Sequence, residues 1–127
     1  MSRYKNNGQT LYYTGIRVDG SAVIKKKLNG TYTTLAQKPV YSGTWSKSSN
    51  PNLIPKNTWI GLRSETINNS DGSVSIKLYM DQGKTGQWKL VAEAKDTSPG
   101  TLKDVGFGGI RTDFMDVEFD NFRQTAI

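Results

Sequence analysis

Residues 74–83 read Val74-Ser-Ile-Lys-Leu-Tyr-Met-Asp-Gln-Gly83, and this stretch decides the fold class. Apolar and polar side chains alternate along it, which is the period of a strand that buries one face and exposes the other. The pattern predicts that Val74, Ile76, Leu78 and Met80 point inward. Helical periodicity is missing elsewhere in the chain, so the sequence predicts an all-β protein.

The same two-residue period recurs on both sides of this stretch. It predicts strands over residues 10–19, 21–28, 31–38, 57–67, 73–81, 86–95, 103–113 and 115–124. Asp19-Gly20-Ser21 and Asn29-Gly30 are tight-turn signals, so the first three strands are expected to form a meander. In 86–95 the alternation places Trp88, Leu90 and Ala92 on one face.

Residues 39–56 contain three prolines and many Ser and Asn residues, which predicts one long loop. The loop carries Tyr41 and Trp45. An aromatic side chain on such a loop serves either as a lid over the sheet below it or as a platform on which a sugar stacks.

Composition removes several classes of chemistry. The 127 residues are enough for a single domain, 1–127, and include no Cys and no His. Disulfides, thiol nucleophiles, the usual zinc sites and imidazole bases are therefore excluded. No apolar run approaches the length of a membrane span, and residues 1–10 are polar, so neither membrane insertion nor a signal peptide is expected.

The net charge of +6 and the pI near 9.6 favour an acidic partner. The densest basic cluster is Lys25-Lys26-Lys27, in which the outer two residues face away from the middle one on a strand. We interpret these lysines as a solvated surface. No nucleic-acid-reading motif is present, so nucleic acid is not the expected partner.

One motif occurs three times: Gly, aliphatic, Arg, any residue, carboxylate. The copies are Gly15-Ile-Arg-Val-Asp19, Gly61-Leu-Arg-Ser-Glu65 and Gly109-Ile-Arg-Thr-Asp113. On a strand each copy places its glycine, arginine and carboxylate on one face. We predict that the three arginines share one sheet and that each pairs with a carboxylate. Such a surface is either an ion-pair ladder that solvates a sandwich or a sugar-binding face.

The central and closing segments resemble a known superfamily. Residues 74–83, with Trp59 before and Trp88 after them, are similar to the central strands of concanavalin A-like lectin/glucanase and laminin-G-like domains. Residues 108–123 are similar to the closing strands of bacterial members. The resemblance covers residues 10–124. It implies an antiparallel β-sandwich of concanavalin-like jelly-roll type, commonly found in secreted carbohydrate-binding modules, polysaccharide hydrolases and lyases.

Members of this superfamily usually have further N-terminal strands, whereas about ten polar residues precede the first strand expected here. The fold is therefore expected to be compact or truncated. Bare sheet edges are seldom left unprotected. We expect either a homodimer or a larger parent protein to cover them. The resemblance also implies an extracellular or periplasmic location.

Two kinds of catalysis are weighed and not favoured. Asp116, Glu118 and Asp120 alternate on one strand, as the carboxylates of related glucanases do, but the segment resembles a closing strand rather than the catalytic one. Gly61-Leu-Arg-Ser-Glu65 resembles the arginine strand of alginate lyases. With no histidine, Tyr12, Tyr13 or Tyr79 would have to act as the base there. The chain is more readily interpreted as a non-enzyme.

The resemblance also implies a structural calcium ion, with Asp120 in the segment Phe119-Asp-Asn-Phe122 as a ligand. Calcium takes six to eight oxygen ligands, so Asp120 would need partners from a turn or the N-terminal segment.

The function expected from the sequence is non-catalytic binding of a polysaccharide, of acidic type if the arginines take part, on a concave sheet face. Alternatives are a polysaccharide-degrading enzyme and a structural self-association module. The expected ligand-binding residues are Arg17, Asp19, Arg63, Glu65, Arg111, Asp113, Trp45 and Trp59.

Overall fold

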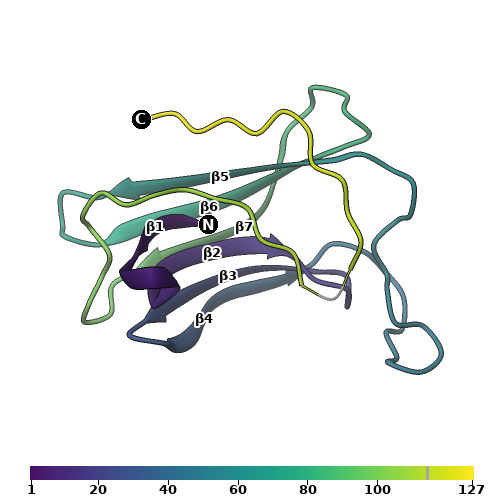
Figure 1. Ribbon diagram of the computed structural model, residues 1–127, viewed down its shortest axis with the longest axis horizontal. Coiled ribbons are helices and arrows are strands. Elements are labelled where there is room, and N and C mark those ends of the chain that lie inside the picture. Colours follow the sequence, from purple (N-terminus) through teal and green to yellow (C-terminus); the bar gives the residue numbers. More distant parts are fainter. Residues whose placement is uncertain (114) are drawn as a thin grey trace.

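The computed structural model describes residues 1–113 and 115–127, and it contains two antiparallel sheets (Figure 1). The first has the order β1-β2-β3-β4 and the second β5-β6-β7. The strands are β1 (Ser2–Lys5), β2 (Thr10–Ile16), β3 (Ser21–Leu28), β4 (Thr31–Pro39), β5 (Ile60–Asn68), β6 (Val74–Gln82) and β7 (Lys89–Asp96). The prediction of an all-β antiparallel sandwich is confirmed.

The core lies between the two sheets. Val74, Ile76, Leu78 and Met80 of β6 are buried, as the alternation predicted. Val74, Ile76 and Leu78 form one core cluster with Tyr12 of β2, Ala22 and Ile24 of β3, and Ala92 of β7. The outward-facing side chains of β6 alternate with the buried ones, so one strand carries both the core and an exposed face.

On β7 the predicted alternation is wrong for the residues that precede Ala92. Leu78 pairs with Ala92 but Tyr79 pairs with Leu90, so the strand has a bulge at this point. A bulge adds one residue and reverses the facing of the side chains that precede it. Leu90 and Trp88 are consequently 41% exposed instead of buried.

Two turns of the chain have the sequence Asp-Gly-Ser, and the one predicted at residues 19–21 is present. The Asp19 carboxylate accepts hydrogen bonds from the backbone N–H and hydroxyl of Ser21, at 3.0 and 2.5 Å. Asp71 accepts the same two bonds from Ser73 at the same distances. Each carboxylate thereby fixes the start of the strand that follows it, which is β3 after Asp19 and β6 after Asp71.

A buried ion pair ties the sheets together. Lys26 of β3 is 4% exposed, and its Nζ lies 3.0 Å from a carboxylate oxygen of Asp96, which is 1% exposed at the end of β7. The Tyr12 hydroxyl donates to Asp96 at 2.7 Å, and Ser98 donates to it through both its N–H and its hydroxyl. The prediction that the three lysines form a solvated surface is therefore wrong for Lys26.

The C-terminal part differs most from the prediction. Residues 103–113 and 115–124 were expected to be strands, but their described residues form none; residue 114 lies outside the described part. Only Phe107 makes an isolated bridge, with Tyr4 of β1, while Gly109 exchanges backbone hydrogen bonds with Met1. An irregular segment thus borders β1, which itself was not predicted.

The stretch between β4 and β5 is the predicted long loop. In it the Trp45 indole N–H donates to the carbonyl of Pro51 at 2.9 Å, and 43% of this residue stays exposed. Tyr41 is half-buried, and its hydroxyl approaches the sulfur of Met80 at 3.6 Å. Tyr41 therefore takes the lid position, whereas Trp45 is held within its own loop. The helical element in the described residues is the three-residue turn η1 (Asn6–Gly8), and no helix there is long and apolar enough to cross a bilayer.

Candidate functional site

The three repeated motifs do not share one sheet. Arg17 follows β2 of the first sheet, Arg63 lies in β5 of the second, and Arg111 lies in the irregular C-terminal segment. The prediction of a single arginine surface is wrong, because β5 pairs with β6 and residues 103–113 join no sheet. Within each copy the expected ion pair is present: Arg17–Asp19 at 3.5 Å, Arg63–Glu65 at 3.5 Å and Arg111–Asp113 at 3.1 Å.

Two of the motifs meet on the outer side of the first sheet. Tyr13 of β2 pairs with Lys25 of β3, and Lys27 pairs with Tyr32 of β4. These side chains alternate with the buried Tyr12 and Lys26, so they point away from the core. Arg111 reaches the same surface from the C-terminal segment. We call the following set the basic tyrosine face: Tyr13, Arg17, Asp19, Lys25, Lys27, Tyr32, Arg111 and Asp113.

Arg111 organises this face. Its Nη1 donates to the Tyr32 hydroxyl at 2.9 Å and its Nη2 donates to Asp113 at 3.1 Å. The hydrogen bond to Tyr32, with the nearby Asp113, holds the pKa of Arg111 above its ordinary value. Its guanidinium also lies 6.0 Å from the centre of the Tyr13 ring. Burial raises the pKa of Tyr13, although Arg111 acts in the opposite direction.

The basic tyrosine face carries an excess of positive charge. Arg17 and Arg111 are each paired with their own carboxylate. Lys25 and Lys27 form no ion pair with any described residue, and their amines lie 6.0 and 5.1 Å from the centre of the Tyr32 ring. Two ammonium groups are therefore left for an external anion. An unpaired surface cation beside an aromatic ring is a suitable contact for a carboxylate or sulfate group on a sugar.

The second motif lies on the opposite side of the sandwich. Gly61, Arg63 and Glu65 of β5 face outward beside Tyr79 of β6, as the two-residue period predicted. The Arg63 guanidinium lies 4.3 Å from the centre of the Tyr79 ring and 5.3 Å from that of Trp88. We call the set Trp59, Arg63, Glu65, Tyr79 and Trp88 the arginine–tryptophan face.

On this face positive and negative groups are balanced. The Tyr79 hydroxyl lies 3.3 Å from Glu65, which also approaches Arg63. Trp59 is 44% exposed, and the Lys84 amine lies 4.9 Å from its ring. The aromatic rings already hold cations of the chain itself. The face is therefore less suited to a polyanion than the basic tyrosine face.

Gly61 lets Trp88 pack against β5. A Cβ at this position would lie 2.9 Å from the Trp88 ring and 3.2 Å from the Cβ of Asp81. We expect Gly61→Ala to lower the free energy of unfolding by about 1–2 kcal/mol, because the ring must move away from Arg63. Urea unfolding followed by tryptophan fluorescence measures this change. Ser64→Ala on the same strand is the control, and an equal loss in both variants would contradict the packing role of Gly61.

The surroundings of Asp120 do not fit a calcium site. The Lys84 ammonium lies 2.9 Å from the Asp120 carboxylate, and the Asn121 side chain donates to it at 3.1 Å. Among the residues that the structure describes, no three acidic side chains gather as metal ligands. A calcium ion needs several oxygen ligands and would be repelled by the ammonium group. Calcium binding at Asp120 stays a prediction, which the described geometry does not support.

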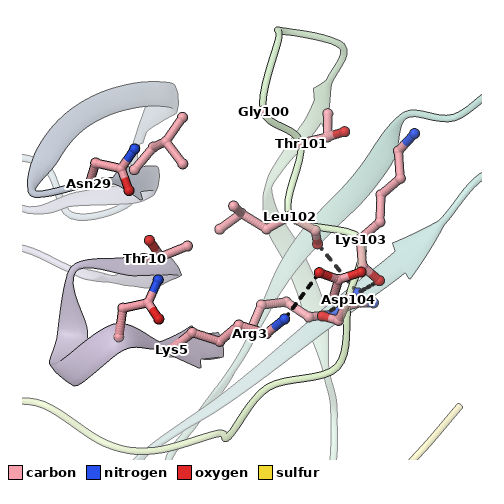
Figure 2. A pocket seen from close by; sticks show the side chains of 11 residues that line it. Arg3, Lys5, Thr10, Asn29, Gly100, Thr101, Leu102, Lys103 and Asp104 are labelled. Carbon is pink, nitrogen blue, oxygen red and sulfur yellow. Dashed lines mark hydrogen bonds and ion pairs between the residues drawn. The ribbon is translucent and has the colours of Figure 1, made fainter.

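A cavity of about 590 Å³ lies apart from both faces, between the N-terminal residues and the loop before residue 105 (Figure 2). Arg3 points into this region, and its guanidinium donates to the backbone carbonyls of Leu102, Lys103 and Asp104. Lys5 pairs with the Asp104 carboxylate at 3.1 Å. These two cations fasten the loop to the N-terminal strand.

Comparisons with protein-family models, curated proteins and solved structures found no match to this chain. The residues of the two faces are therefore the basis for assigning a function. Sequence reasoning had selected Arg17, Arg111 and their carboxylates but had not joined them to Lys25, Lys27 and Tyr32. The sequence feature that could have linked these residues is that Lys25 and Lys27 face the opposite side of a strand from Lys26. The two-residue turn Asn29-Gly30 sets the register that places Tyr32 across from Lys27, whereas no local pattern predicts that Arg111 approaches Tyr32.

Proposed function

We propose that this chain is a non-catalytic carbohydrate-binding module of the concanavalin-like kind that binds an acidic polysaccharide on the basic tyrosine face. One observation carries the proposal: Lys25 and Lys27 stand without carboxylate partners among the described residues beside Tyr32, where Arg111 also converges. The net charge of +6 favours the same class of ligand.

Recognition on this face combines two kinds of contact. The two lysine amines pair with carboxylate or sulfate groups that repeat along the polysaccharide, and this attraction weakens as salt screens it. Arg111 is oriented by Tyr32 and Asp113, so its remaining N–H groups are presented in a fixed direction. Asp19 and Asp113 can accept hydrogen bonds from sugar hydroxyls.

A glycan competition experiment tests the proposal. We expect polyuronates and sulfated glycans to bind and to displace one another, whereas neutral glucans of equal length do not compete. Affinity should fall steadily as sodium chloride is raised, because the contacts are exposed charge pairs. Microscale thermophoresis with a labelled polyuronate measures both effects. Binding to a neutral glucan that does not change with salt would contradict the proposal, and equal competition by duplex DNA would show that charge alone is recognised.

The arginine–tryptophan face supports a second candidate, a uronate lyase. In such an enzyme a cation neutralises the sugar carboxylate while a base removes the proton from the carbon that bears it. A carbon–carbon double bond then forms as the bond to the glycosidic oxygen breaks, and that oxygen takes up a proton. Arg63 lies against Tyr79, whose hydroxyl is 3.3 Å from Glu65. Tyr12 and Tyr13 are unsuitable bases, because burial raises both of their pKa values.

An unsaturated-product assay separates the two functions. The lyase candidate requires ultraviolet absorbance to grow during incubation with a polyuronate and requires Tyr79→Phe to abolish it. The binding-module proposal expects the polysaccharide to be bound and to remain intact. Because Tyr79→Phe leaves the basic tyrosine face unchanged, it should not reduce binding.

A further inference from the structure

Strand β5 has an open edge. It is the first strand of the second sheet and pairs on one side only, with β6 (Figure 1). The carbonyl of Trp59 accepts from the N–H of Gly83, and the N–H of Asn69 donates to the carbonyl of Ser73, so odd-numbered residues of β5 face β6. In an antiparallel ladder the alternate residues direct their backbone groups the other way. Ile60, Leu62, Ser64, Thr66 and Asn68 therefore direct their backbone N–H and C=O groups to the open edge, where no strand pairs with them.

The sequence of β5 is complementary to itself when reversed. If two copies pair antiparallel about Ser64, residue 62 of one lies opposite residue 66 of the other, and Arg63 lies opposite the second copy's Glu65. The open-edge residues become hydrogen-bonded pairs in this register, as the ladder requires. Two arginine–carboxylate pairs then form across the junction. Shifting the centre to Arg63 would place the two arginines directly opposite each other, which is unfavourable.

The state of these side chains in the single chain favours such a partner. Arg63 makes no hydrogen bond with any described residue; its Nε merely approaches Glu65 at 3.5 Å. Leu62 is 49% exposed although it points to the inner side of the sheet. β5 thus carries a guanidinium whose N–H groups make no hydrogen bond with the described residues and an apolar side chain that is half exposed. Natural sheets seldom leave a nine-residue edge of this kind uncovered.

We propose that two copies of this chain associate through β5, antiparallel about Ser64, to form a continuous six-stranded sheet. Residues of this edge already make three contacts: the Ser2 and Thr66 hydroxyls lie 2.7 Å apart, the Asn68 side chain donates to the Lys103 carbonyl at 2.9 Å, and the Arg3 side chain reaches the Thr66 carbonyl at 3.5 Å. The last of these occupies a backbone group of β5 and must give way. This contact is long, and Arg3 also donates to three other carbonyls, so it can release Thr66 to the Leu62 N–H of the other copy. The dimer does not depend on the polysaccharide proposal, because the basic tyrosine face belongs to the other sheet.

Charge variants test the register. Arg63→Glu gives an edge with two acidic residues and Glu65→Arg an edge with two basic ones, so each variant repels its own copies. Sedimentation velocity over a series of protein concentrations should show a dimer for the wild type, a loss of dimer for each variant alone, and recovery of a dimer when the two are mixed. Glu93→Arg is the matched control, because Glu65 and Glu93 flank Lys77 from opposite sides. It should dimerise like the wild type.

A cysteine variant gives an independent readout. The chain contains no cysteine, so a single Ser64→Cys substitution introduces one thiol. In the proposed dimer the two copies of residue 64 face each other about 5.5 Å apart, which a disulfide can bridge. Mild oxidation should cross-link Ser64→Cys but not Leu62→Cys, whose counterpart lies opposite Thr66. A wild-type monomer at every concentration, or equal cross-linking of both variants, would overturn the proposal.

Discussion

Asp96→Ala is expected to lower the free energy of unfolding by about 3–5 kcal/mol, because it leaves the buried Lys26 ammonium without its counter-ion. Asp96 accepts from Tyr12, Lys26 and Ser98, which belong to β2, β3 and the loop after β7. Lys26 is almost as buried as Asp96, and its other hydrogen-bond acceptors among the described residues are the Ser98 hydroxyl and the Pro99 carbonyl. Urea unfolding followed by circular dichroism measures the loss.

The chain offers a matched control for this substitution. Asp71 makes the same two contacts with a serine two residues on and also pairs with a lysine, Lys95, at 2.6 Å. Its carboxylate is exposed, so Asp71→Ala should cost much less than Asp96→Ala. Equal losses in the two variants would show that the turn, and not the buried ion pair, stabilises the fold.

The same pair predicts a dependence on pH. Burial by itself raises the pKa of Asp96, but the hydrogen bonds from Ser98, Tyr12 and Lys26 outweigh it and hold this pKa below its ordinary value. The unfolded chain therefore takes up the proton first as the pH falls. The contribution of Asp96 is present above pH about 4 and is lost below it. Asp96→Ala should show a weaker loss of stability over that acid range than the wild type.

The double variant Lys25→Glu/Lys27→Glu is expected to weaken binding to a polyuronate by about 100-fold, equivalent to about 2.7 kcal/mol. The substitutions replace the two ammonium groups that have no ion-pair partner among the described residues with groups that repel the ligand. Both side chains point away from the core, so the thermal unfolding midpoint should change little. Isothermal titration calorimetry measures the affinity.

Lys77→Glu/Lys89→Glu makes the same change of charge on strands β6 and β7 of the other sheet. It should retain most of the affinity, apart from the general loss of net positive charge. If both double variants lose affinity equally, total charge would explain binding and the basic tyrosine face would have no special role.

The sequence predicted the all-β class and the central strands because local alternation carries that information. Residues 74–83 show this clearly: their inward side chains are the buried ones. The bulge that exposes Trp88 and Leu90 left no such signal, because it depends on the pairing with β6. The alternation in 115–124 predicted a strand, but alternation shows only which side chains would be buried if a strand formed. Whether a neighbouring strand is available is a property of the whole fold.

The candidate site was predictable only in part. Spacing alone predicted that each arginine would approach the carboxylate two residues later, and all three pairs form. Which motifs share a surface depends on sheet order, which separates Arg63 from Arg17. The burial of Lys26 could not be derived either, because its partner Asp96 lies 70 residues away along the chain. Long-range partners of this kind decide which charges of a cluster stay available to a ligand.

The central claim is that an acidic polysaccharide binds the outer side of the first sheet, and backbone amide chemical shifts during titration with a uronate oligosaccharide test it most directly. The account predicts saturable, salt-sensitive shifts centred on Tyr13, Lys25, Lys27, Tyr32 and Arg111. Residues of β5 to β7 should remain unchanged when the protein concentration is held constant. Shifts confined to Trp59, Arg63 and Trp88, or no shifts at saturating oligosaccharide, would contradict it.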